Sequence, residues 1–177
     1  MKKKYFIIFI FIYLISNNLY AQSIAIVNIQ YLIDNNKYYK ITEKEIQTSR
    51  TTNLKKFEKK EIELQNLFND IENSKLILNQ NEINLKIENY NKKLDDFTIL
   101  IEEFNFHYQN QIINIREAIL KEIIALLEKY AVENNIDLIL DSTTYLIASN
   151  SLDITNNINN KLEKLNLNLE YKDFEKY

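Results

Sequence analysis

The chain reads YNKKLDDFTILIEEFNFHYQNQIINIREAILKEIIALLEKY from Tyr90 to Tyr130, and its apolar side chains recur at alternating steps of three and four. The 11 steps span 40 residues, about 3.64 residues per step, which is close to the period of a straight α-helix. The stripe consists of Tyr90, Leu94, Phe97, Ile101, Phe104, Tyr108, Ile112, Ile115, Ile119, Ile123, Leu126 and Tyr130. This stretch predicts one long helix with little supercoiling.

A second helical pattern precedes this stretch. Its apolar stripe has a seven-residue period, which keeps it on one face of a helix, and consists of Phe57, Leu64, Ile71 and Leu78. Residues 78–82 carry two Asn, which supply turn geometry in a chain that has no Gly and no Pro. We therefore predict an antiparallel helical hairpin over residues 41–133, with helices of about 40 to 50 residues and lengths of about 60 to 75 Å.

Short β-branched runs flank the predicted hairpin. They predict strands at 23–29, 136–141 and 144–148, a helical turn at 31–33, and a last helix that begins at Asp153 or Thr155 and ends near Leu165. The fold class is therefore α+β and mainly α: a small β-body from which a long antiparallel coiled-coil hairpin projects.

The predicted body has about 42 residues, near the size below which a domain needs metals, disulfides or oligomerisation to stay folded. The chain has no Cys and its sequence shows no cluster of metal ligands, so oligomerisation remains. Apolar side chains within residues 118–127 also spread over more than one helix face. We predict a trimer or another symmetric assembly, with a core drawn from Ile24, Ile26, Ile119, Ile123, Leu126, Leu138 and Leu140.

The N-terminus has the features of a cleaved secretory signal peptide. Three lysines, Lys2 to Lys4, precede an apolar run of 11 residues from Tyr5 to Ile15, and Ala21 is a small residue suited to cleavage. The run is shorter than the roughly 20 residues that cross a bilayer. The sequence thus predicts export through a signal peptide.

The two ends of the chain resemble the Skp/OmpH family of periplasmic chaperones. The similarity lies in the IAIVN strand at residues 24–28, the NIDLILD run at 135–141 and the SLDIT run at 151–155, on either side of a long charged hairpin. It covers residues 23 to about 166. The resemblance implies a periplasmic homotrimer whose three helical arms enclose unfolded outer-membrane β-barrel proteins without ATP.

Taken with this resemblance, the chain divides into five segments. They are the signal peptide at 1–21, the N-terminal part of the trimerisation body at 22–40, the hairpin at 41–133, the C-terminal part of the body at 134–166, and a C-terminal segment at 167–177. In that last segment and just before it, Leu165, Leu167, Leu169 and Tyr171 alternate with polar residues. This period fits either an added edge strand or a disordered end.

The hairpin carries more apolar side chains than one seam can bury. Adjacent residues such as Leu76 and Ile77 lie about 100° apart around a helix, so some apolar residues must leave the seam. Client contacts are expected from Leu54, Phe57, Phe68, Leu76, Ile77, Ile83, Leu85, Phe97 and Leu100.

Basic residues gather between residues 50 and 60, where the net charge is +4. Arg50, Lys55, Lys56, Lys59 and Lys60 stand against Glu58 alone. This basic patch is either a solvated helix face or a site that attracts acidic polypeptide, with weak contact to anionic lipid as a lesser role. We expect no nucleic-acid partner.

Catalysis is not expected. Without Gly the chain has no Gly-rich phosphate loop, and the acid pairs Asp95-Asp96 and Glu102-Glu103 point in different directions on a helix. His107, the single His, is interpreted as a helix-surface residue, and no cofactor is predicted. The main hypothesis is an ATP-independent holdase, and the alternative is a structural coiled-coil linker of the cell envelope, anchored by an uncleaved signal segment.

Overall fold

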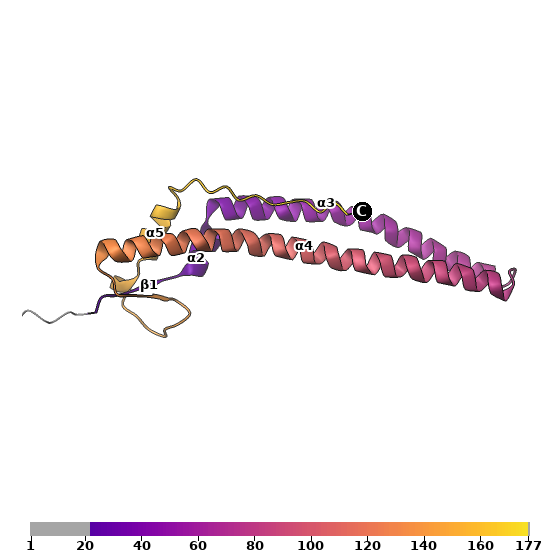
Figure 1. Cartoon of the computed structure of the whole chain (residues 1–177), viewed down its shortest axis with the longest axis horizontal. Helices are drawn as coiled ribbons and strands as arrows, with labels where there is room; N and C mark the ends of the chain where they lie inside the picture. Colours follow the sequence, from indigo (N-terminus) through magenta and orange to yellow (C-terminus); the bar gives the residue numbers. More distant parts are fainter. Residues whose placement is uncertain (1–21, 177) are drawn as a thin grey trace, which may run out of the picture.

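A computed structural model describes residues 22–176 as a small body with one long helical hairpin (Figure 1). The elements are β1 (Ile24–Val27), α2 (Ile29–Asn35), α3 (Lys37–Ser74), α4 (Gln80–Asn134), β2 (Leu138–Asp141), the 3-10 turn η1 (Asn150–Leu152) and α5 (Thr155–Leu162). The predicted signal peptide lies outside the described residues. No helix among residues 22–176 combines the length and apolar character that a bilayer crossing requires.

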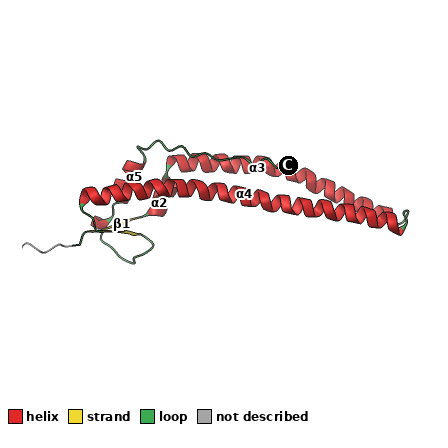
Figure 2. Cartoon of the chain, in the orientation of Figure 1, coloured by secondary structure: helices red, strands yellow, loops and turns green. Residues whose placement is uncertain are grey.

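The helices α3 and α4 form the hairpin, hereafter the arm, and confirm the antiparallel pair predicted from the two periodicities (Figures 1 and 2). Its seam buries Phe57, Leu64 and Ile71, as the seven-residue stripe predicts. Leu78 lies beyond α3, and Leu94 is exposed, so these two stripe residues leave the seam.

The reversal occupies residues 75–79, slightly earlier than predicted, because Asn79 starts α4. The Asn79 side chain accepts from the Glu82 backbone N–H, and the Glu82 carboxylate accepts from the Asn79 backbone N–H, both at 3.1 Å. This capping box satisfies two backbone donors that a helix start leaves unpaired. Local capping therefore fixes the turn without Gly.

The body is built on a two-stranded parallel sheet, in which Ile24 of β1 pairs with Leu138 of β2. The end of α4 contacts β2, the helices α2 and α5 pack on α4 and on each other, and Ile119, Ile123 and Ile158 are fully buried in this body. Asn135 ends α4 with a left-handed backbone, φ 52°, which directs the chain into β2. Asn tolerates this conformation better than other residues with a side chain.

Arg116 of α4 fixes the base of the arm to α2. Its guanidinium donates to Asp34 at 3.1 Å, to Gln30 at 2.9 Å and to the Tyr39 hydroxyl at 3.2 Å. These contacts join α4 to α2 and to the start of α3, so the arm leaves the body in a defined direction.

Two expectations about the C-terminal part are wrong. Residues 144–148 form no strand but belong to the irregular loop 142–149, because no neighbouring strand within the described chain pairs with them. Residues 163–176, hereafter the tail, are neither an edge strand nor detached. They run in an extended form from α5 along α3 toward the middle of the arm (Figure 1).

Candidate functional site

The tip of the arm exposes two adjacent apolar side chains. Leu76 and Ile77 lie in the reversal between α3 and α4 and are 94% and 84% exposed. The buried residues of the seam that are nearest to the tip are Ile71 of α3 and Ile83 of α4. Apolar surface at this position is available to contact another polypeptide.

A second apolar surface, hereafter the outer stripe, lies on α4. Its exposed members are separated by multiples of seven residues, and they are Leu85, Ile99, Phe106 and Ile113. Phe104 and Tyr108 lie two positions before and after Phe106 and are buried in the seam. Residues two positions apart in a helix point about 200° away from each other, so Phe106 points to the opposite side. The outer stripe therefore faces away from the α3 partner.

The predicted client-contact residues fall into two groups. Phe57, Ile83 and Phe97 are buried in the seam, where the Phe57 and Phe97 rings lie 6.0 Å apart, and Leu100 is partly buried against the same core. The exposed members are Leu54, Phe68, Leu76, Ile77 and Leu85. Phe57 and Phe97 belong to the two stripes that predict the seam, whereas Ile83 and Leu100 lie outside those stripes, so periodicity did not predict their burial.

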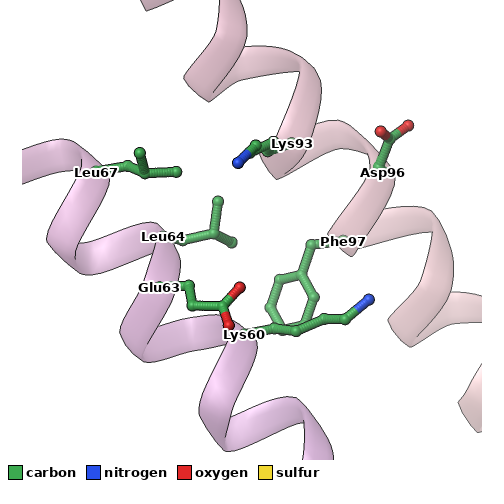
Figure 3. A pocket seen from close by; sticks show the side chains of 7 residues that line it. All are labelled: Lys60, Glu63, Leu64, Leu67, Lys93, Asp96 and Phe97. Atoms are coloured by element: carbon green, nitrogen blue, oxygen red, sulfur yellow. The ribbon is translucent and has the colours of Figure 1, made fainter. Parts of the chain in front are cut away.

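A cleft of about 240 Å³ opens between α3 and α4 in the half of the arm nearer its tip (Figure 3). The apolar side chains Leu64 and Phe97 point toward one another from the two helices, while Asp96 points away. The complete lining is Lys60, Glu63, Leu64, Leu67, Lys93, Asp96 and Phe97. Two basic and two acidic side chains rim an apolar floor, so the cleft has no net charge.

The predicted basic patch lies on α3. Lys55, Lys56 and Lys59 are exposed, whereas Arg50 and Lys60 are half-buried. Arg50 donates to Asn105 of α4 at 3.3 Å, and Lys60 lines the cleft. The structure thus places the five cations on one helix, with two of them turned toward α4.

The residues proposed for a trimer core also include both buried and exposed side chains. Ile26, Ile119 and Ile123 are buried within the chain's own body, and Leu126 and Leu140 are half-buried. Ile24 and Leu138, which pair across the sheet, are exposed. The loop 142–149 adds Leu146 and Ile147, which are 100% and 93% exposed.

The tail makes a polar contact with the arm that the sequence did not reveal. Asp173 Oδ1 accepts from Ser49 Oγ, from the Asn53 amide at 2.9 Å and from the Tyr108 hydroxyl at 2.6 Å. Partial loss of solvent around the Asp173 carboxylate by itself raises its pKa, but hydrogen bonds from Ser49, Tyr108, the Phe174 N–H and Asn53 outweigh it and lower that pKa. Burial, together with Asp173, raises the pKa of Tyr108.

The next tail residue, Phe174, is buried against α4. Its ring lies edge-on to Phe104 at 5.4 Å and to His107 at 5.5 Å. His107 is therefore half-buried under the tail rather than a plain surface residue, and its Nε2 lies 2.7 Å from the Lys172 carbonyl oxygen. The alternation of leucines from Leu165 onward was the sequence signal of an extended, one-sided segment.

No group of three or more His, Cys, Asp or Glu side chains between residues 22 and 176 is arranged to hold a metal ion. The described residues offer apolar surfaces, a cleft whose charges balance and a tail seated on the arm.

Residues 23–162 match the family described as outer membrane protein (OmpH-like). A search of curated proteins found no match. Among solved structures, a candidate outer membrane chaperone (OmpH-like) from Caulobacter crescentus CB15 is similar, with 13% sequence identity and a TM-score of 0.59 over 86% of this chain and 93% of that chain. At this identity the similarity shows the fold. The family match ends at α5, before the tail.

Proposed function

The chain belongs to the OmpH-like family of outer membrane proteins, and on this basis we propose that it is an ATP-independent holdase chaperone of the periplasm. Its clients are unfolded outer-membrane β-barrel proteins, which it holds between helical arms. The similar Caulobacter crescentus protein, a candidate outer membrane chaperone, supports the same role. Export by a signal peptide at residues 1–21 is part of the proposal.

The observation that carries the proposal is the apolar surface that the arm leaves uncovered. The tip residues Leu76 and Ile77 and the outer stripe on α4, which runs from Leu85 to Ile113, offer dispersed contacts along about 40 Å of helix and at its tip. Many weak apolar contacts bind unrelated sequences and keep their strand edges from pairing with one another.

A homotrimer joined through the body follows from the same physics. Besides its two-stranded sheet the body exposes apolar side chains, namely Leu146, Ile147, Leu138 and Ile24, which a second copy can cover. Burial of these side chains against two further copies would set three arms around a common cavity. The basic patch on α3 would then attract acidic client segments and, more weakly, anionic lipid.

The test is aggregation of a denatured outer-membrane β-barrel protein diluted into buffer with the mature chain, without nucleotide. We expect suppression at one trimer per client. The paired substitutions Leu76→Ser with Ile77→Ser, and Ile99→Ser with Phe106→Ser, should each weaken suppression several-fold. Val132→Ser is the control, since Val132 is exposed on the part of α4 that belongs to the body.

Absence of suppression by the wild-type chain at this ratio would overturn the proposal. Recovery of the chain in membranes with residues 1–21 attached would favour the alternative, a membrane-anchored structural linker of the cell envelope.

A further inference from the structure

The tail occupies a defined place on the arm. Thr42 of α3 donates to the Leu169 carbonyl at 3.4 Å, and farther along the same helix Ser49 and Asn53 donate to Asp173. The tail therefore runs parallel to α3 and antiparallel to α4. It lies between the two helices as an extended segment outside the family match.

The place that receives Asp173 contains buried donors from both helices. Asn53 is 4% exposed and Tyr108 is 2% exposed, although both carry polar groups. Asn53 lies seven residues after Ile46 on the buried side of α3, where the seam is otherwise mostly apolar. Asn53 donates to the Tyr108 hydroxyl at 2.8 Å, and Ser49 Oγ lies 2.9 Å from that hydroxyl. Buried donors require acceptors, and the carboxylate of Asp173 completes this network by accepting from both Asn53 and Tyr108.

The adjoining place receives an aromatic ring and a peptide group. Phe174 is buried beside Phe104 and His107. The Lys172 backbone is held on both sides: its N–H donates to Gln111 Oε1 at 3.1 Å, and its carbonyl oxygen lies 2.7 Å from His107 Nε2. Contacts to the backbone do not depend on the bound residue type, whereas the two neighbouring places select a carboxylate and a ring.

We infer that the arm carries a binding site for an extended polypeptide segment in which an acidic residue precedes an aromatic one, that the tail occupies this site at rest, and that a client segment of the same chemistry displaces it. The displacement step rests on the proposed function, whereas the site itself does not.

The tail is a suitable resting occupant because it is tethered but shallowly held. Between α5 and Phe174 its apolar residues are only half-buried, and its polar residues are exposed. Segments with few buried contacts open locally at low free-energy cost. A tethered segment nevertheless competes at a high effective concentration, so it excludes weak external ligands while it is intact.

The test uses a fluorescent peptide of residues 163–176 and the mature full-length chain. In the chain variant Asp173→Ala with Phe174→Ala, the tail is weakened while every arm residue remains. We expect the peptide to bind this variant at least tenfold more tightly than the wild type, and Tyr108→Phe added to the variant to weaken binding several-fold. The chain with Glu175→Ala, an exposed tail position, should behave like the wild type.

Three results would overturn the inference. They are no peptide binding by the tail-weakened chain, equal binding of a peptide that itself carries the two alanines, and failure of a denatured client to displace the bound peptide. Aggregation suppression is measured in a separate assay. If the chain fails to suppress aggregation but the peptide still binds, the proposed function is overturned while the peptide site is established. Helical content by circular dichroism confirms that each variant is folded.

Discussion

The Tyr108 hydroxyl donates a 2.6 Å hydrogen bond to Asp173 across a separation of 65 residues. Tyr108 lies in the middle of α4 and Asp173 lies in the tail, so this bond joins the end of the described chain to the arm. Ser49 and Asn53 of α3 donate to the same carboxylate oxygen. One carboxylate thus connects three segments of the protein.

Tail docking should depend on acid pH in a defined direction. The folded pKa of Asp173 is lowered from 3.8, so its contribution is complete above pH 3.8 and is lost as the pH falls through the lowered value. NMR of the Phe174 amide, which donates to Asp173 at 2.8 Å, reports this step directly. Asp173→Asn should abolish it, and a midpoint at or above 3.8 would contradict the assignment.

Alkaline pH should release the tail by a separate step. The pKa of Tyr108 is raised from 10.0 by burial and by Asp173, so the contribution of its neutral hydroxyl persists below pH 10 and is lost as the pH rises through the raised value. The same NMR signal, followed from pH 8 upward, checks this, and Tyr108→Phe should remove the alkaline step. Loss of docking well below pH 10 in the wild type would count against it.

Two phenylalanines that lie two positions apart on α4 should differ sharply in how much their replacement by alanine destabilises the protein. Phe104 is 1% exposed and touches Phe57, Tyr108 and Phe174, whereas Phe106 is 66% exposed. Phe104→Ala should lower the free energy of unfolding by about 3 to 5 kcal/mol through lost burial and a cavity. Phe106→Ala should change it by less than about 0.5 kcal/mol. Urea unfolding followed by circular dichroism at fixed protein concentration measures both.

Position 135 should tolerate replacement of Asn by Gly but not by a β-branched residue. Its backbone is left-handed at φ 52° and ψ 46°, a conformation that costs ordinary L-residues about 1 to 2 kcal/mol. We expect Asn135→Val to lower the free energy of unfolding by about that amount, and Asn135→Gly to change it by no more than a few tenths of a kcal/mol. Thermal unfolding of the two variants compares them, and equal losses would show that the side chain rather than the backbone matters.

The loop 142–149 should control assembly. Leu146→Asp with Ile147→Asp places charge where the proposed trimer buries two apolar side chains. We expect native mass measurement to show a monomer with a similar helical content. The matched control, Leu76→Asp with Ile77→Asp, changes an equally exposed pair at the arm tip and should keep the trimer. A trimer in both variants would exclude the loop as an interface.

Much of the fold follows from short-range sequence pattern. The stripe from Tyr90 to Tyr130 predicts α4, and Phe57, Leu64 and Ile71 predict the seam side of α3, because contacts between residues three, four or seven apart are set by helix geometry alone. The two ends also sufficed for the family resemblance, which the match over residues 23–162 confirms.

The sequence pattern predicted less about which residues form the candidate site. Ile83 and Leu100 are covered by neighbouring side chains while Leu76 and Ile77 are not, and residues 144–148 have strand composition without a strand partner in the described chain. A strand forms only when another strand pairs with it, and a side chain is buried only where a distant segment covers it.

The sequence by itself determined the helices, their reversal near Asn79 and the family, since each depends on residues close together in the chain or on a linear motif. Only the tertiary structure decided which apolar surfaces stay open and where the tail lies. The contact of Asp173 with Ser49, Asn53 and Tyr108 joins residues more than 60 positions apart, and no local period encodes which distant donors a carboxylate will meet.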